Sequence, residues 1–260
     1  MELDIRVACP SYKRPVVRTL LYLPYAKVYV SPEEEAAYQA ANPGAAIIAC
    51  PPGVQGNVSR VRNHILDTEF DDGADAVLIM DDDVRRVCYW ERMKQFPVSQ
   101  RGFPAFMEKH TIMAQDIGAR MWGVSVNADK QTYREYQPFS TLSFLGGPFG
   151  CFLRGNECRY DESLPLKEDY DMTLQQLSRY RVNLRLNKFF YDCLQSQQAG
   201  GCATYRNLDN EAEQFRRLQE KWGSEIVRID HVDNRSHSKN RKKRVTLDYN
   251  PVLRIPIRGV

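Results

Sequence analysis

Three consecutive carboxylates follow an apolar segment of strand length. Residues 76–80 read AVLIM, and Asp81, Asp82 and Asp83 come directly after them. Adjacent like charges raise one another's pKa unless they point into water or a cation gathers them. Carboxylate oxygens are the ligands that Mg²⁺ and Mn²⁺ prefer. Because alternate side chains of an extended segment face the same way, Asp81 and Asp83 are the expected metal ligands, and a solvated turn is the alternative.

A second acidic pair, Glu168 and Asp169, lies at the expected start of a helix within KEDYD, residues 167–171. Acidic side chains in a first turn stabilise the helix dipole, which gives this pair an ordinary structural explanation. If the pair faces a cleft that holds a metal and a nucleotide, one carboxylate can act as the general base for a hydroxyl nucleophile. Both residues are therefore candidate catalytic groups.

The loop PSYKR, residues 10–14, follows the first expected strand. Tyr12 and Arg14 can hold a base or a ribose, although tyrosine and arginine in a loop often only cover apolar surface. We take four residues of this loop as candidate nucleotide contacts: Pro10, Ser11, Tyr12 and Arg14.

The segment GNVSRVRN, residues 56–63, opens an expected helix. The backbone amides and dipole at a helix N-terminus favour a phosphate, and nearby arginines add charge. An N-capped surface helix with ordinary arginines is the alternative. The candidate nucleotide-binding residues here are Asn57, Arg60, Arg62 and Asn63.

The order of elements in the first half predicts an α/β domain with a mainly parallel sheet flanked by helices. Apolar runs of strand length and segments of helical spacing alternate along the chain. In such sheets ligands bind beyond the carboxyl ends of the strands, where the loop at 10–14, the helix start at 56 and the aspartates all fall. The expected strands are 3–9, 27–30, 45–50 and 74–80, and the expected helices are 31–44 and 57–70.

The second half is less regular and shows no linker or internal repeat. Strand-like runs surround Gly146 and Gly147. We expect a single domain over 1–260, with a nucleotide-binding half at about 1–126 and an acceptor half with a basic tail at about 127–260. The further predicted elements are a strand at 121–126 and helices at 103–119, 166–181 and 208–223.

Overall charge says little about partners, since the net charge of the 260 residues is +3. A local cluster is more informative, and SKNRKKR at 238–244 is such a cluster. It is either a solvated segment or a contact for a diphosphate or for nucleic-acid phosphates. The candidate phosphate or DNA contacts are Lys239, Arg241, Lys242, Lys243 and Arg244.

Seven cysteines without a CxxC pair argue against a disulfide framework and against a thiolate zinc site. We expect reduced, mostly buried thiols. The four histidines show no metal-binding spacing, although His231 or His237 in the polar tail could reach a metal, and we include His237 as a candidate ligand. No apolar run of about 18 residues is present, so a soluble, cytoplasmic protein without membrane contact is expected.

Taken together, PSYKR, GNVSRVRNHIL, ADAVLIMDDDV, GGPFGCFLRG and RYDESLPLKEDYD resemble the nucleotide-sugar glycosyltransferases of GT-A fold, especially those like family 2. The resemblance spans about residues 3–181. More closely, VYVSPEEEAAY, GNVSRVRNHILD and LIMDDDV look like the phage-type TET-associated glycosyltransferases, which are thought to add sugars to hydroxymethylated pyrimidines in DNA.

The resemblance implies roles for the acidic residues. Asp81 would contact the ribose or base side of the sugar nucleotide and the metal, and Asp83 would bind the metal that bridges the diphosphate. Asp169 would take the proton of the acceptor hydroxyl, with Glu168 supporting it. Asp82 would lie near the donor sugar or the acceptor.

It also implies that Arg62 and Asn63 line the nucleotide pocket and that Gly146 and Gly147 lie near the donor sugar or the acceptor. One motif departs from the pattern, because the QxxRW acceptor motif of family 2 is absent. QFRRLQEKW at 214–222 has similar letters but lies on an expected helix. The identity of the acceptor is correspondingly open.

The expected function is metal-dependent transfer of a sugar from a UDP-sugar to a hydroxyl acceptor, with 5-hydroxymethylcytosine in phage DNA as the favoured acceptor. Mn²⁺ or Mg²⁺ is the expected cofactor, and direct attack with Asp169 as base would invert the anomeric centre. The alternatives are a carbohydrate or small-molecule acceptor, a nucleotidyltransferase that releases pyrophosphate, and a non-catalytic nucleic-acid-binding module. The sugar, the nucleotide and the oligomeric state are not determined by the sequence.

Overall fold

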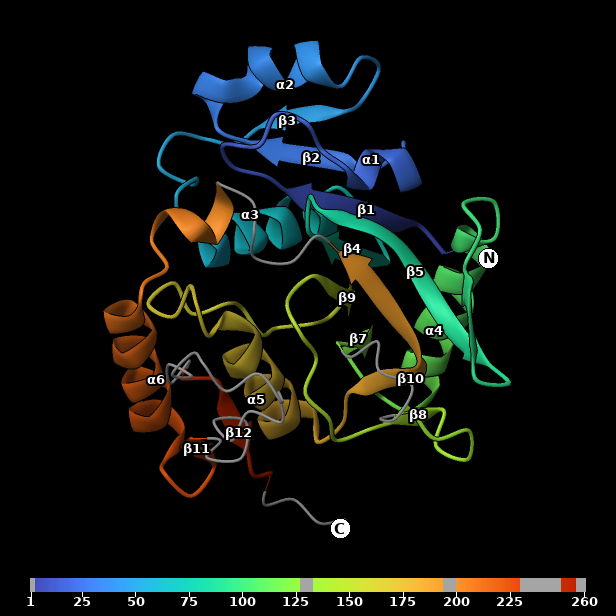
Figure 1. Cartoon of the computed structure of the whole chain (residues 1–260), viewed down its shortest axis with the longest axis vertical. Helices are drawn as coiled ribbons and strands as arrows, with labels where there is room; N and C mark the ends of the chain where they lie inside the picture. The colour runs from blue at the N-terminus through green and yellow to red at the C-terminus, as the bar shows by residue number, and fades with distance from the viewer. Residues whose placement is uncertain (1–2, 127–132, 194–199, 230–248, 256–260) are drawn as a thin grey trace, which may run out of the picture.

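A ten-stranded sheet forms the centre of the computed structural model, which describes residues 3–126, 133–193, 200–229 and 249–255 (Figure 1). Its strands are β1 (Ile5–Pro10), β2 (Lys27–Val30), β3 (Ile47–Ala49), β4 (Ala76–Met80), β5 (Val84–Glu91), β6 (Lys94–Pro97), β7 (Met121–Ser125), β8 (Phe139–Ser140), β9 (Phe149–Leu153) and β10 (Leu184–Cys193). Their spatial order is β3-β2-β1-β4-β9-β7-β10-β5-β6, and β8 pairs with β10.

Most strands of this sheet point the same way. Strands β3, β2, β1 and β4 pair in parallel, as do β7 and β10. Strand β9 runs antiparallel between β4 and β7, and β5 runs antiparallel to β10. The predicted α/β fold with a mostly parallel sheet is therefore confirmed, and its carboxyl edge carries the loops singled out above.

Helices cover both faces of the sheet. They are α1 (Thr19–Tyr22), α2 (Glu35–Ala41), α3 (Val58–Asp71), α4 (Phe103–Asp116), α5 (Glu168–Tyr180) and α6 (Leu208–Trp222), with 3₁₀ turns η1 (Pro32–Glu34) and η2 (Gly201–Thr204). The helices predicted from periodicity are confirmed. The one expected over 31–44 begins with η1, because the Ser31 hydroxyl hydrogen-bonds the Glu33 carboxylate instead of capping the helix. A small sheet of β11 (Val227–Ile229) and β12 (Pro251–Leu253) packs beside α6 (Figure 1).

The core explains why β4 reads as a continuous apolar run. All five of its residues are buried, as expected for a central strand covered on both faces. On one face Leu78 packs in a cluster with Phe103 of α4 and Trp122 of β7. On the other face Val77 packs in a cluster with Ile65 of α3. The strand that ends in the three aspartates is thus held rigidly from both sides.

The hairpin of β5 and β6 was not predicted. Strand β5 breaks simple alternation, because Arg85 and Arg86 are both exposed between the buried Val84 and a buried pair. Its turn residues, Arg92 and Met93, adopt positive φ values of 47° and 62° without the Asn-Gly or Asp-Gly signal that normally marks such turns. Strand β10 was missed as well.

All seven cysteines are free thiols and five of them are buried, which confirms the expected reduced state. Within the described segments, the longest apolar helices fall short of what a membrane crossing requires. His231, His237 and the basic run at 238–244 lie outside the described residues. The division into two halves near residue 126 stays a prediction.

The cap of α3 provides the first prediction. The Asn57 Oδ1 accepts hydrogen bonds from the amides of Ser59 and Arg60 at 3.0 and 3.3 Å. We expect Asn57→Ala to lower the free energy of unfolding by about 1 kcal/mol, because two amides lose their acceptor. Urea denaturation measures this, and Asn57→Asp, which keeps the acceptor oxygen, is the control. An Asn57→Ala midpoint equal to that of the wild type would refute the capping role.

Candidate active site

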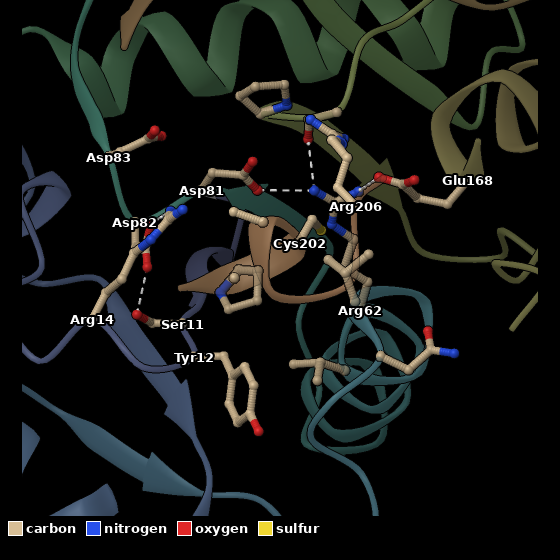
Figure 2. Close-up of a pocket in the computed structure, with 18 of the residues that line it drawn as sticks. Ser11, Tyr12, Arg14, Arg62, Asp81, Asp82, Asp83, Glu168, Cys202 and Arg206 are labelled. Atoms are coloured by element: carbon tan, nitrogen blue, oxygen red, sulfur yellow. Dashed lines mark hydrogen bonds and ion pairs between the residues drawn. The ribbon is translucent and has the colours of Figure 1, made fainter. Parts of the chain in front are cut away.

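A cavity of about 440 Å³ opens at the carboxyl edge of the sheet (Figure 2). It brings together four segments that are distant in sequence: the loop after β1, the start of α3, the end of β4 and the start of α5. Of the predicted site residues, the cavity is lined by Pro10, Ser11, Tyr12, Arg14, Asn57, Arg62, Asp81, Asp82, Asp83, Gly147, Glu168 and Asp169.

Arg62 lies at the centre of this arrangement, with only 2% of its side chain exposed. Its Nη2 donates to Asp81 Oδ1 at 2.8 Å and to the Gly147 carbonyl at 3.2 Å. Its Nη1 donates to Glu168 Oε1 at 2.9 Å. One guanidinium therefore joins the end of β4, the turn before β9 and the start of α5 (Figure 2).

The charge of Arg62 is maintained by these partners. Burial by itself lowers the pKa of an arginine, but the negative charges of Asp81 and Glu168 raise the pKa of Arg62 above its ordinary value. The Tyr160 ring, 5.5 Å from the guanidinium carbon, adds a cation–π contact. The Nε atom is buried and has no hydrogen-bond partner among the described residues. The residue is thus a fixed positive charge in a largely dry place.

The three aspartates lie in the turn between β4 and β5 and not on an extended segment, so the expected alternation does not set their directions. Figure 2 shows Asp81 turned toward Arg62, and Asp82 turned toward Ser11 and Arg14. Asp83 lies on the same side as Asp81 and Asp82, away from Glu168. Burial, together with the charges of Asp81 and Asp82, raises the pKa of Asp83 to about 6.

Asp82 ties the loop after β1 to β4. Its Oδ2 accepts from the Ser11 hydroxyl at 2.6 Å and its Oδ1 accepts from Arg14 Nη1 at 3.0 Å. The Ser11 hydroxyl also lies 2.8 Å from that of Tyr38, which accepts from the Arg14 amide at 3.0 Å. Both carboxylate oxygens of Asp82 are therefore engaged within the protein, and a role for Asp82 at the donor sugar stays a prediction.

Glu168 and Asp169 form the acidic wall opposite the aspartates. Asp169 Oδ2 accepts from the Gly147 amide at 3.1 Å, and its Oδ1 accepts from the Tyr170 amide at 2.8 Å. Burial is the main cause that raises the pKa of both carboxyls, and the pKa of Glu168 reaches about 7. The pKa of Asp169 is thus raised toward the operating pH, which makes its carboxylate a better general base.

The carboxylates suit a divalent cation that shares its ligands with a substrate. Among the described residues no group of three acidic, histidine or cysteine side chains is poised to hold a metal alone. Mg²⁺, however, normally takes one or two carboxylates and completes its shell with substrate phosphates and water. Burial and the charges of Asp81 and Asp82 disfavour the ionised form of Asp83, so a bound cation would be stabilised there. Asp81 and Asp83 fit such a shared site.

Three predicted residues do not line the cavity: Arg60, Asn63 and Gly146. Arg60 pairs with Glu162 at 2.8 Å on the surface. The Asn63 side chain brackets Tyr160, donating to its carbonyl at 2.8 Å and accepting from its amide at 2.7 Å. A Cβ on Gly146 would collide with Val126, which gives that glycine a packing reason.

The first turn of α3 does not offer the free backbone amides of Ser59 and Arg60 that a phosphate would need. Asn57 already satisfies the amides of Ser59 and Arg60 with its own Oδ1, and its Nδ2 donates to the Glu162 carbonyl at 2.8 Å. A diphosphate in the cavity would therefore depend on arginine side chains more than on these two amides.

The sequence profile of the TET-associated glycosyltransferases matches residues 23–201, which is more than half of the chain. The protein belongs to this family. It is a glycosyltransferase, and its mostly parallel α/β sheet is the one predicted. Among curated proteins, none matches the sequence.

Two solved structures illustrate how distant the structural relatives of this glycosyltransferase are. A glucosyl-3-phosphoglycerate synthase from Mycobacterium tuberculosis, in complex with Mn²⁺, UDP and glucosyl-3-phosphoglycerate, is 12% identical. The match covers 89% of this chain and 85% of that one, with a TM-score of 0.48. S. aureus TarS 1–349 is 11% identical over 73% of this chain and 59% of that one, with a TM-score of 0.45. The family assignment rests on the sequence match.

The glycosyltransferase cavity has one wall that the sequence analysis missed, formed by residues 200–206. Cys202, Tyr205 and Arg206 line the cavity from this segment. A Cβ on Gly200 would lie 2.8 Å from the Lys13 carbonyl, so a glycine is needed where the two loops meet. The Gly200-Gly201 pair was the available signal. Arg206 is half exposed and pairs with Glu211 at 3.1 Å.

Arg62 provides the second prediction. We expect Arg62→Met to lower the free energy of unfolding by about 3 kcal/mol at pH 8, because Asp81 and Glu168 lose their buried cation. The folded-state pKa of Glu168 is already above its unfolded value of about 4.3, and the substitution raises it further. Glu168 of the variant therefore takes up a proton on folding. The difference in the free energy of unfolding between variant and wild type is expected to shrink as the pH falls to 6.

Urea unfolding at pH 8 and pH 6 measures both effects. Arg60→Met on the same helix is the matched control, because Arg60 is partly exposed and its surface ion pair is expected to contribute no more than about 0.5 kcal/mol. An Arg62→Met deficit that is small, or equal at the two pH values, would show that the buried ion pairs do not hold the site together.

Proposed function

We propose that this glycosyltransferase transfers a sugar from a UDP-sugar to the hydroxymethyl group of 5-hydroxymethylcytosine in DNA, with Mn²⁺ or Mg²⁺ as cofactor. One observation carries the proposal: Arg62 joins the aspartates after β4 to the acidic pair of α5 in a single cavity. Family membership supports the hydroxymethylated acceptor. The UDP-sugar follows from the resemblance to family 2 enzymes.

The cavity offers separate ends for the two parts of the donor. Tyr12 and residues 55–58 line the end near α3, and they would hold the base and the ribose. Arg62 and Arg206 would neutralise the diphosphate. Asp81 and Asp83 would hold the divalent cation, which when bound offsets the charge that develops on the departing nucleoside diphosphate.

Asp169 is the proposed general base. Its two oxygens accept from the amides of Gly147 and Tyr170, which fixes the carboxylate in orientation. The acceptor hydroxyl gives its proton to Asp169 while its oxygen bonds to the anomeric carbon of the sugar. The bond from that carbon to the phosphate oxygen breaks, and its electron pair leaves with UDP. Attack from the side opposite the leaving group inverts the anomeric centre.

Glu168 would support the base electrostatically. Its carboxylate accepts from Arg62 at 2.9 Å, so its negative charge is partly offset when Asp169 is ionised. If Glu168 ionises, it disfavours ionisation of its neighbour, and Asp169 becomes a stronger base. The pair is expected to titrate together.

The third prediction tests the reaction. A panel of sugar nucleotides with Mn²⁺ and hydroxymethylcytosine DNA is expected to give a hexose-sized mass gain on the modified nucleoside, measured by mass spectrometry after digestion. Asp83→Ala is expected to abolish the gain, because the metal loses a ligand. Metal-dependent hydrolysis of the donor without any mass gain would be consistent with a glycosyltransferase, but it would reject hydroxymethylcytosine as the acceptor. Release of pyrophosphate in place of a nucleoside diphosphate would indicate nucleotidyl transfer.

The fourth prediction tests the base. We expect Asp169→Asn to reduce kcat by about 10² to 10⁴, because the amide cannot take a proton. In the wild type kcat should fall as the pH drops, since burial raises the pKa of Asp169 above its ordinary value and the base must be deprotonated. Asp209→Asn in the first turn of α6 is the matched control, with wild-type kcat expected. Retention of configuration in the product, seen by NMR, would exclude this role of Asp169.

A further inference from the structure

The hairpin of β5 and β6 starts at the rim of the active-site cavity. Asp83 lines the cavity and directly precedes β5. Cys193 also lines it and pairs with Val84, the first residue of β5. The first residues of this hairpin therefore border the end of the cavity where Asp83 lies, away from Tyr12 and the start of α3 (Figure 2).

Two adjacent arginines occupy this border. Arg85 and Arg86 are 50% and 54% exposed, and neither lines the cavity. They contact opposite sides of one carboxylate group: Arg85 reaches Asp192 Oδ1 at 2.6 Å and Arg86 reaches Asp192 Oδ2 at 3.2 Å. The register between β5 and β10 shifts just after Asp192, which lets both neighbours reach it. Two cations share one anion, so the border carries excess positive charge.

Positive charge continues along the hairpin. Arg92 at the turn and Lys94 at the start of β6 are exposed, with Glu91 as the exposed acid between β5 and the turn. Strand β6 forms an edge of the sheet with all four residues exposed. Pairing of β5 with β10 extends to Tyr89, whereas pairing with β6 continues to Glu91, so the end of the hairpin lies beyond the part of β5 that pairs with β10. We call Arg85, Arg86, Arg92 and Lys94 the hairpin strip.

We propose that the hairpin strip binds the phosphate backbone of the acceptor DNA and sets the target base at the cavity. The proposal rests on the proposed function, since it names the surface that holds that acceptor. A plain alternative is that charged residues only keep an exposed sheet edge from pairing with another chain. That alternative explains the charges on β6, but it does not explain why two arginines share a single carboxylate beside Asp83.

The dimensions of the strip match a DNA strand. Six residues separate Arg86 from Arg92, which is about 20 Å at the usual rise of a strand. A DNA strand carries one phosphate for about every 3.4 Å of helix axis, so the strip spans roughly six nucleotides. A base that is turned out of the duplex into the cavity leaves its flanking phosphates at the rim, where Arg85 and Arg86 lie.

The donor is not the ligand of this strip, because the diphosphate belongs inside the cavity with Arg62. The cavity itself is lined by five carboxylates and three arginines, so it offers little attraction to a polyanion. An acceptor with many phosphates needs cations that lie outside the cavity and close to the reacting end. Arg85 and Arg86 meet both conditions.

The test compares two double variants with the same change in charge. Arg85→Gln with Arg86→Gln removes the cations at the rim. Arg216→Gln with Arg217→Gln removes an adjacent exposed pair on α6 that also shares one acid, Glu213. The binding of a hydroxymethylcytosine duplex is measured from 50 to 200 mM salt. We expect the rim variant to flatten the slope of log affinity against log salt by about 2, and to raise Kd on the order of tenfold. The α6 variant should keep the wild-type slope.

A single substitution gives the opposite expectation. Asp192→Asn removes the carboxylate that both arginines contact, so more positive charge is available to DNA. We expect Kd to fall several-fold and the slope of log affinity against log salt to steepen. An unchanged or weakened affinity for this variant would overturn the assignment.

The outcomes separate this proposal from the proposed function. If the wild type modifies DNA and the rim variant keeps the wild-type slope of log affinity against log salt, the proposed function stands and the role proposed for the hairpin strip is wrong. If the rim variant loses donor hydrolysis as well as DNA binding, the substitutions disturb Asp83 and the assignment falls. If the wild type hydrolyses the donor but neither binds nor modifies DNA, the DNA acceptor is rejected and the strip with it.

Discussion

The buried guanidinium of Arg62 is the interaction on which the active-site cavity depends. It contacts Asp81 after β4, Glu168 at the start of α5 and the carbonyl of Gly147. Without this cation the carboxylates of Asp81 and Glu168 would repel each other. Each would also lose its partner, and leaving a buried charge unpaired costs several kcal/mol. The positions of the aspartates relative to the α5 acids are therefore set by one side chain, and the two halves of the reaction site cannot be placed independently.

Other parts of the fold serve to place this side chain. Helix α3 buries Val61 and Ile65 against the sheet, and its first turn is fixed by the Asn57 cap. Because Arg62 follows Val61 on this helix, the packing of the apolar face determines where the guanidinium lies. The turn before β9 joins this arrangement through its backbone, since the Gly147 carbonyl accepts from Arg62 Nη2 and the Gly147 amide donates to Asp169 Oδ2.

Periodicity and motif order were sufficient to predict the parallel strands other than β10, the main helices and the convergence of three loops at one edge, since these depend on local patterns. The partners of individual side chains were not predictable. Asn63 was expected in the pocket, yet it brackets Tyr160, which lies 97 positions away in the sequence. The β5–β6 hairpin was missed because its turn lacks the usual residues, and the wall at 200–206 because only a glycine pair marks it. Contacts of long sequence separation leave little trace in a local pattern.

The charges of the cavity indicate that the donor and the proposed DNA acceptor bind at different places. Its described lining has five carboxylates, Asp81, Asp82, Asp83, Glu168 and Asp169, against Arg14, Arg62 and Arg206. Arg14 is engaged by Asp82 and Arg62 by two acids, so part of the positive charge that they would offer a diphosphate is already offset. A divalent cation at Asp81 and Asp83 would reverse this balance at the point where the phosphates lie. The same acidic lining repels the backbone of DNA, so an acceptor of that kind can enter only as a single base while its phosphates stay at the rim. With DNA as the proposed acceptor, a site that is acidic inside and basic at its border would separate a small donor anion from a long polyanion by position alone.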